Sequence, residues 1–284
     1  GGPTLYEQTG KANRSARFNG GLEQLGTGPM SSSQSGKEFD RLEQYAKLEA
    51  APPIKFKDLD EFITSHKVLT GPFFPFDVRT DFVRVTDDTV QVPVTLQIRN
   101  RDVTYKTTDG VSRGTVNILG RVSTITGRIA QTFEDTVEID EPAELLPKTL
   151  NSKSVYWKAL PLRPGRYRLD IVIKDVNNPD HIGTYARAFI VPEYDDDKLA
   201  ASSLILADKM QEVPSKDIGT GQFVIGNTFI RPRVSASASQ PVSFKRDQAL
   251  DFWMQAYNPK INTKTKQNEA TVHYLVTDVG DHKT

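Results

Sequence analysis

The sequence contains no cysteine, which excludes disulfide bonds, thiolate metal sites and cysteine nucleophiles together. It has only four histidines, and no two of them have the spacing of a metal-ligand pair. No apolar run approaches the roughly 18–20 residues that a transmembrane helix needs, so no transmembrane segment is predicted. The lack of cysteine does not by itself define the cellular compartment, because many exported proteins also have none.

The charge of the chain has no dominant sign. Lys and Arg together number 36, and Asp and Glu together also number 36, so the formal net charge is zero. Proteins that bind nucleic acid or anionic membrane surfaces carry clusters or an excess of basic residues. We therefore do not expect nucleic acid or an anionic membrane surface as a partner.

Sequence motifs of catalysis are also missing. No Gly-x-Ser-x-Gly pattern marks a serine nucleophile, and the serine-rich stretch 31–36 has the composition of a flexible linker. The glycines of Gly219-Thr220-Gly221 are not followed by the Gly-Lys-Ser/Thr of a phosphate-binding loop. We therefore predict a protein without catalytic residues, enzymatic activity or a cofactor.

The first 52 residues differ in composition from the rest of the chain. Residues 1–36 are rich in Gly, Ser, Thr and Asn, and such a stretch buries too little apolar surface to offset the entropy lost on ordering it. Apolar residues at helical spacing follow in 38–48, and Pro52-Pro53 ends that pattern. We expect an extended arm over 1–52 with a short helix near 38–48. A chain that starts on Gly-Gly without methionine is expected to be a processed part of a longer protein.

After Pro53 the apolar residues recur at every second position, which is typical of β-strands. In Val90–Ile98 five apolar residues alternate with polar ones, so a half-buried strand is predicted there. Pro93 lies on the polar phase, which favours an edge position or a bulge because proline donates no backbone hydrogen bond. A hairpin arm is predicted at 82–85, and further strands at 115–126, 131–139, 167–174 and 185–191.

The segment from Leu162 to Tyr167 carries the clearest marker of a fold. Pro164 presets its φ angle and Gly165 accepts a positive φ, so the Pro-Gly pair predicts a turn. In Greek-key sandwiches a tyrosine just after such a turn packs its ring inward and bonds its hydroxyl to an upstream backbone group. We therefore predict a tyrosine corner formed by Pro164, Gly165 and Tyr167, in preference to an ordinary turn with an exposed tyrosine.

A second set of strand patterns begins near residue 199. Strands are expected at 204–206, 250–257 and 271–277, with a hairpin over 223–230 that turns at Gly226-Asn227. Short strands without intervening helices indicate an all-β protein. We predict two immunoglobulin-like, Greek-key β-sandwich modules, the first over 53–194 and the second over 195–284. The second lacks the corner of the first, so we expect it to be truncated or completed by other sequence.

Calcium is the metal that loops of this type most often hold, through carboxylate and carbonyl oxygens. Asp175, Asn177 and Asp180 lie together in a turn-rich segment, and Glu193–Asp197 is an acidic cluster. Asn, Asp and Pro are equally the residues that form turns, and the spacing of an EF-hand is missing. We therefore predict no metal site, with Asp175, Asn177 and Asp180 as weak candidates for one.

Aromatic residues offer two further candidates. Phe73, Phe74 and Phe76 form a compact apolar run that is either an exposed docking patch or, as we favour, a plug at one end of the sandwich. Tyr156-Trp157 and Trp253 could form a carbohydrate platform, but the apolar context of Trp253 favours core packing.

Several long segments resemble one family: 4–8, 41–48, 54–59, 75–82, 159–165, 202–208 and 219–227. Through them the chain resembles, over nearly its full length, the C-terminal β-rich part of the GWxTD-domain proteins, found mostly in Acidobacteria and their relatives. The resemblance implies an exported protein with a signal peptide, a mainly helical domain that carries the Gly-Trp-x-Thr-Asp motif, and then β-rich modules. The motif is not in this chain, so the resemblance implies architecture and a location in the periplasm or at the cell surface rather than chemistry.

Two functions follow as hypotheses. The first is a non-enzymatic structural or interaction protein, a scaffold or accessory subunit of a cell-envelope assembly, whose partner is another protein or a further copy of itself. Strand addition at the unfinished second module is its expected mode of binding. The alternative is a module that binds a glycan or peptide and is attached to an upstream domain. An open cleft with exposed aromatic side chains would favour this alternative.

Overall fold

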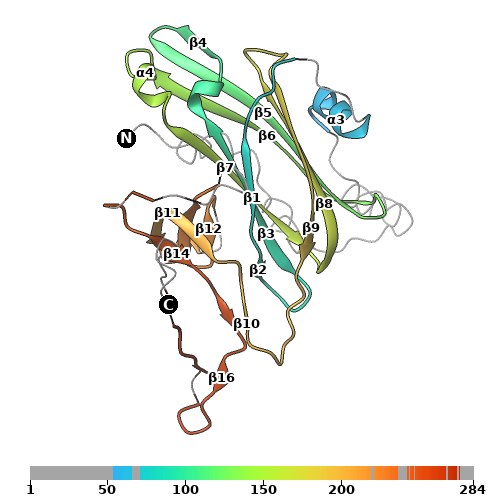
Figure 1. Cartoon of the computed structure of the whole chain (residues 1–284), viewed down its shortest axis with the longest axis vertical. Helices are drawn as coiled ribbons and strands as arrows, with labels where there is room; N and C mark the ends of the chain where they lie inside the picture. Colours follow the sequence, from blue (N-terminus) through green and yellow to red (C-terminus); the bar gives the residue numbers. More distant parts are fainter. Residues whose placement is uncertain are drawn as a thin grey trace, which may run out of the picture.

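The computed structural model describes residues 54–65, 71–218, 221–235, 242, 244–245, 247–266, 268–273 and 275. The arm over 1–52 and its helix near 38–48 lie outside these residues. Of the strand expected at 271–277, residues 271–273 and 275 are described, and they are not in a strand. Strands dominate the described part of the chain, and they pair antiparallel (Figure 1). The prediction of an all-β sandwich is confirmed.

Two sheets face each other around the larger hydrophobic core (Figure 1). One, here called the β3 sheet, consists of β1 (Asp77–Thr80), β2 (Val83–Arg84), β3 (Val90–Arg99) and β7 (Lys153–Leu162). The other, here called the β8 sheet, consists of β4 (Tyr105–Thr108), β5 (Val111–Thr124), β6 (Ile129–Pro142), β8 (Gly165–Asp175) and β9 (Ile182–Val191). A 3-10 turn, η2 (Asn100–Asp102), precedes β4, and a short helix, α4 (Leu146–Thr149), lies between β6 and β7.

The strand order places β3 between β7 and the pair β1 and β2, and it runs β6, β5, β8, β9 in the other sheet. The core forms where the apolar phases of the two sheets meet, because successive side chains of a strand point to opposite faces. Its fully buried members include Val92 and Leu96 of β3, Ile118 of β5, and Leu169 and Ile171 of β8.

β3 differs from its prediction in one respect. It is a central strand, so the expected edge position of Pro93 is wrong, and its register shows no bulge. Pro93 is tolerated because its carbonyl accepts from the N–H of Asp81 at 3.1 Å, so its nitrogen faces the break between β1 and β2, where no ladder bond is lost. The polar phase is also buried: Thr95 and Gln97 are covered by the C-terminal part of the chain.

Gly120 of β5 leaves room for an aromatic ring on the neighbouring strand. It pairs with Phe133 of β6, and a Cβ at position 120 would lie 2.0 Å from the Cζ of Phe133. Overpacking of this kind typically costs about 1–3 kcal/mol. We expect Gly120→Ala to lower the free energy of unfolding by about that amount in urea denaturation. Phe133→Leu in the same background should recover part of the loss, whereas an unchanged midpoint for Gly120→Ala would contradict this packing.

Helix α3 (Lys57–Thr64) covers the outer face of the β8 sheet (Figure 1). Leu59 is fully buried there against Leu119 of β5 and Val172 of β8. The carboxylate of Glu134 accepts from the backbone N–H of Phe56 at 2.7 Å, which fixes the start of the helix on the edge strand β6. This helix was not predicted from the sequence.

The C-terminal part contains one small sheet, with the strand order β12 (Val224–Ile225), β13 (Thr228–Pro232), β11 (Ile205–Glu212), β14 (Asp251–Trp253). Two short ladders pair β10 (Ala200–Ala201) with β15 (Ala256–Tyr257), and β16 (Lys260–Ile261) with β17 (Asn268–Glu269). The 3-10 turn η3 (Ser215–Asp217) follows β11. The expected hairpin is present as β12 and β13, with Gly226 at a positive φ of 59°. Within the described residues no helix is long and apolar enough to cross a membrane.

Candidate functional site

The predicted corner residues lie where the chain passes from the β3 sheet to the β8 sheet. β7 ends at Leu162 and β8 begins at Gly165 in the opposite sheet. The Tyr167 ring is buried in the core, and its hydroxyl donates to the carbonyl of Arg163 at 3.0 Å. A tyrosine corner is defined by a hydrogen bond of this kind. Here it ties the start of β8 to the connection that leads from β7 to β8.

The weak calcium candidates serve the fold instead. Asp175 is fully buried, and its carboxylate accepts from the backbone N–H groups of Thr104 at 2.7 Å and Asn177 at 2.9 Å. The side-chain amide of Asn177 donates to the carbonyls of Thr104 and Arg113, and Asp180 is exposed. Through these bonds Asp175 and Asn177 hold the turn against the segment before β4 and against β5. No group of metal-ligand residues occurs in the part of the chain that the structure describes.

The three phenylalanines of the possible docking patch do not gather on the surface. Phe74 is fully buried and stacks on His181 with ring centroids 4.5 Å apart. Phe76 is partly buried against the core, and Phe73 is 54% exposed. The carbohydrate platform is also excluded at Tyr156-Trp157, because both rings are buried.

A second hydrophobic cluster joins the C-terminal part to the outer face of the β3 sheet. Val83, Val155 and Trp157 contribute from the sandwich. The C-terminal side contributes Ile205, Ala207, Phe223, Ile225, Phe229 and Ile230. The ring of Phe223 contacts that of Trp157 with centroids 5.8 Å apart. Because of this cluster, the outer face of β3 is buried rather than exposed to solvent.

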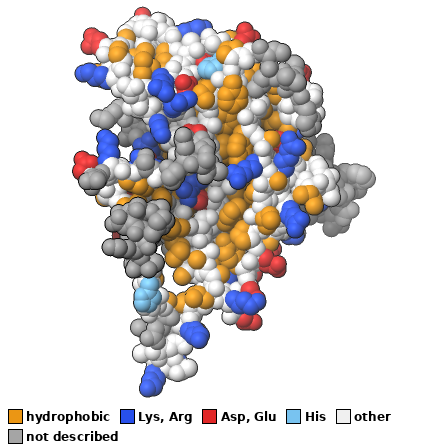
Figure 2. Space-filling model, viewed as in Figure 1, with side chains coloured by type: hydrophobic (Ala, Val, Ile, Leu, Met, Phe, Trp, Pro, Cys, Tyr) orange, Lys and Arg blue, Asp and Glu red, His pale blue; other side chains and the backbone are white. Residues whose placement is uncertain are grey.

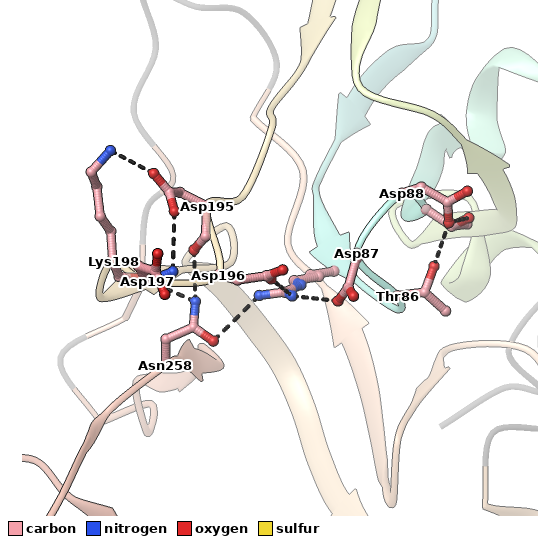
Figure 3. A network of polar contacts seen from close by, with 10 residues as sticks. Thr86, Asp87, Asp88, Asp195, Asp196, Asp197, Lys198 and Asn258 are labelled. Atoms are coloured by element: carbon pink, nitrogen blue, oxygen red, sulfur yellow. Dashed lines mark hydrogen bonds and ion pairs between the residues drawn. The ribbon is translucent and has the colours of Figure 1, made fainter.

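A polar network joins β2 and the turn after it to the C-terminal part of the chain (Figure 3). Arg84 forms ion pairs with Asp87 at 2.6 Å and with Asp196. The backbone N–H of Arg84 donates to the Tyr257 hydroxyl at 2.8 Å. Asn258 donates its side-chain amide to the carbonyl of Asp195 at 2.8 Å (Figure 3). Hydrogen bonds from three separate segments converge here, so the network is a structural joint rather than a free binding site.

One lateral opening of the sandwich is closed by polar contacts between β6 and β7. The Tyr156 hydroxyl donates to Asp135, and Lys158 lies 3.5 Å from the same carboxylate. Gln131 donates to the Pro161 carbonyl at 3.3 Å. Burial, and then the nearby Asp135 carboxylate, raises the pKa of Tyr156, so this hydroxyl stays protonated as a donor.

The opposite lateral opening, between β1 and β9, is apolar, and no side-chain hydrogen bond crosses it among the described residues. Figure 2 shows a hydrophobic stripe that runs along it between the two edge strands. The partly buried apolar residues of β1, of β9 and of the segments beside β1 that pack against the core are Phe76, Val78, Phe82, Tyr185 and Phe189. The rings of Phe82 and Phe189 stack across the opening with centroids 6.2 Å apart. We call this feature the β1–β9 groove.

In the part of the chain that the structure describes, the β9 side of the groove is a strand edge that is unpaired beyond Ile182. β9 pairs with β8 along one side over Ile182–Val191 without a shift of register. On its other side, within the described residues, only Ile182 has a backbone hydrogen bond: its carbonyl accepts from the N–H of Phe74 at 3.0 Å. Alternate residues of a strand direct their backbone groups to the same side, so those of Thr184, Ala186, Ala188 and Ile190 also point outward. No partner for them occurs among the described residues.

A small pocket of about 170 Å³ lies on the outer face of the sheet beside this edge. Phe62 and Ile63 of α3 form one wall, and Thr184 and Ala186 of β9 form part of the floor. This volume is below the roughly 300–1,000 Å³ of typical small-molecule sites. Arg168 and Asp170 also line it, so it has both polar and apolar walls and room for a single side chain.

Sequence reasoning missed the groove. The alternation in 185–191 predicted a strand, but nothing in it indicated that the strand would be an edge. Arg187 was the available signal, because it interrupts the apolar phase between Tyr185 and Phe189, and charges on the inward phase are typical of edge strands.

Glu141 is a buried carboxylate of β6 that gives the fold a pH dependence. It lies opposite Ser112 of β5, and burial raises its pKa above the ordinary value of 4.5. A carboxylate with a higher pKa in the folded state binds its proton more tightly there, so stability falls as the pH rises between the unfolded and folded pKa values. We expect Glu141→Gln to raise the urea midpoint at neutral pH and to lose this advantage below pH 4.5. An equal difference at both pH values would show that ionisation of Glu141 is not the cause.

Comparisons with known proteins do not assign the chain to a family. No protein-family model matches it, and neither does any curated protein.

Solved structures match part of it weakly. A calcium-binding mutant of Bacteroides uniformis β-glucuronidase 2 matches 45% of this chain at 9% identity and a TM-score of 0.30. A glycosyl hydrolase family 2 member from Bacteroides cellulosilyticus matches 42% at 14% identity and a TM-score of 0.28. The matched segments span only 13% and 15% of those chains. Similarity at this level supports no functional argument.

Proposed function

We propose that this protein is a non-enzymatic interaction protein, a scaffold or accessory subunit of a cell-envelope assembly, and that its partner binds at the β1–β9 groove. The observation that carries the proposal is a strand edge without a partner among the described residues, beside an apolar stripe, on a sandwich whose other lateral opening is closed by hydrogen bonds. Exposed edges attract further strands, and contiguous apolar surface marks sites of protein interaction.

The location in the periplasm or at the cell surface rests on the resemblance to the GWxTD-domain proteins. The immunoglobulin-like character of the module over 53–194 is supported by the hydrogen bond from Tyr167 to Arg163. The proposed place of binding differs from the expected one: we propose the edge of β9 on the first sandwich rather than the C-terminal part, whose sheet has β12 and β14 as its edges.

A ligand-binding module is the alternative, and the aromatic lining of the groove favours it. Phe76, Phe82 and Tyr185 are the kind of side chains that recognise glycans or peptides. Glycan sites also need several convergent polar groups, whereas the groove offers mainly a strand edge and one arginine. A polypeptide partner therefore fits these features better than a sugar does.

The proposal is tested by photo-crosslinking in the source organism. A photoreactive amino acid at Ala188, on the free edge of β9, should crosslink to a partner that mass spectrometry identifies. The matched control is the same amino acid at Glu138, which is exposed on β6, the opposite edge of the same sheet. Equal crosslinking from both positions, or none from Ala188, would rule out this groove as the binding site.

A further inference from the structure

Building on the proposed function, we propose that the partner enters as an extended polypeptide strand that adds to the free edge of β9 and places a carboxylate opposite Arg187. The partner is thus defined by its chemistry: apolar side chains at alternate positions, with one acidic residue between them on the same face. The backbone, the side chains on each face and the charge of the groove each support this inference.

The backbone of β9 is ready to accept a strand. Four residues direct N–H and C=O groups outward from Thr184 to Ile190, and their side chains lie on the outer face of the sheet. Ala186 and Ala188 are short, so they do not shield these groups. The bond from Phe74 to Ile182 shows that this edge already accepts an extended segment at its start. A strand that continues this pairing would satisfy the remaining groups.

The inner face selects apolar residues. The side chains of Tyr185 and Phe189 point toward the core and are only partly buried. Val78, on the other side of the groove, is partly buried in the same way. Alternate residues of an added strand would cover these three side chains and extend the core.

The outer face of the β8 sheet provides a second site that can select a side chain of the added strand. The pocket beside Thr184 and Ala186 lies next to the edge and is walled by Phe62 and Ile63. Because Arg168 and Asp170 also line the pocket, it would receive one side chain of the outer phase of the added strand without requiring that side chain to be apolar.

Arg187 supplies the specificity. It lies between Tyr185 and Phe189 on the inward phase, yet it is exposed, and no ion pair joins it to another described residue. An added strand would take its guanidinium out of water, which is costly without a counter-charge. A partner glutamate or aspartate opposite Arg187 would provide that charge, and opposite charges on facing strands stabilise the pair.

A second copy of this chain fits the edge less well. Arg187 is the midpoint of the free edge from Thr184 to Ile190. A copy of β9 paired antiparallel about this midpoint would place the two Arg187 side chains directly opposite each other. Like charges in that position destabilise a strand pair.

The experiment uses labelled seven-residue synthetic peptides and fluorescence anisotropy with the full chain. The probe has a central glutamate with valine two residues away on each side, and a matched peptide has lysine at the centre. We expect the glutamate peptide to bind, and Arg187→Glu to weaken it about fivefold to tenfold while improving the lysine peptide. Glu138→Lys on β6 is the control charge reversal and should leave both affinities unchanged.

Two further changes test the backbone pairing. N-methylation of the peptide on the phase that faces β9 should abolish binding, whereas N-methylation on the other phase should not. Ala188→Pro should weaken binding about tenfold without unfolding the chain, because the lost N–H makes no bond to β8. The N-methylated peptides keep the test decisive even if the proline variant misfolds.

The outcomes separate this inference from the proposed function. If Ala188 crosslinks to a partner but the peptides bind without dependence on N-methylation or on charge, the groove is the site and strand addition is wrong. If neither the peptides nor the crosslink gives a signal, both proposals fall. A dimer that Ala188→Pro dissociates would assign the edge to a second copy and overturn the inference.

Discussion

Asp175→Ala is expected to lower the free energy of unfolding by about 3–5 kcal/mol, because it leaves two buried backbone donors without an acceptor. The carboxylate of Asp175 is fully buried and binds the N–H groups of Thr104 and Asn177. Through these bonds it ties the end of β8 to the segment that enters β4. Urea denaturation followed by circular dichroism measures the change.

Two controls make this result specific. Asp175→Asn keeps one acceptor oxygen and should cost less than the alanine variant. Asp180→Ala removes an exposed carboxylate from the same turn and should leave stability nearly unchanged. If added calcium raised the melting temperature of the wild type, and Asp175→Ala and Asp180→Ala both removed that effect, the turn would be a cation site and the structural interpretation would be wrong.

Phe223→Ala is expected to have an effect of similar size, about 3–5 kcal/mol, but confined to the C-terminal part of the chain. Phe223 is 1% exposed and packs its ring between Trp157 and Phe229. Its backbone has a φ of 62°, a left-handed conformation that costs a bulky residue about 1–3 kcal/mol. The packing of the ring must offset this strain, so removal of the ring leaves the local conformation unsupported.

Hydrogen exchange locates the effect. In Phe223→Ala the amides of β11 and β13 should exchange faster, while those of β5 and β8 stay protected. Phe252→Ala is the matched control, because Phe252 is 38% exposed and its loss should matter little. Equally fast exchange in all four strands would show that the sandwich and the C-terminal sheet unfold as one unit.

The strands that could be predicted from the sequence are those whose residue types alternate between apolar and polar. β3 alternates in this way over Val90–Ile98 although both of its faces are buried, so the residue types and not the burial made it visible. β7 was not predicted, although it pairs with β3 along ten residues from Lys153 to Leu162. Residues 154–157 of β7 are all buried, because the sandwich covers one face and the C-terminal part covers the other. Apolar side chains on both faces leave Val155, Tyr156 and Trp157 in one run without alternation, unlike β3, whose second face carries polar residues.

The candidate site was less accessible to prediction than the fold. Asp175 and Asn177 were named as weak candidates for a metal site. Their spacing could not reveal that they bind backbone groups far away in the sequence, at Thr104 and Arg113. The β1–β9 groove depends on which strands lie at the edges of the two sheets. Strand order is a long-range property, and local patterns do not contain it.

The apolar contact under the C-terminal sheet has a practical consequence for dissecting the protein. Val83, Val155 and Trp157 are buried only because residues after 204 cover them. A fragment that ends at residue 194 would expose these three side chains to water, and the apolar sheet surface that they form would favour aggregation. Polar substitutions at these three positions are therefore the first step toward a monomeric sandwich that can be studied without the C-terminal part.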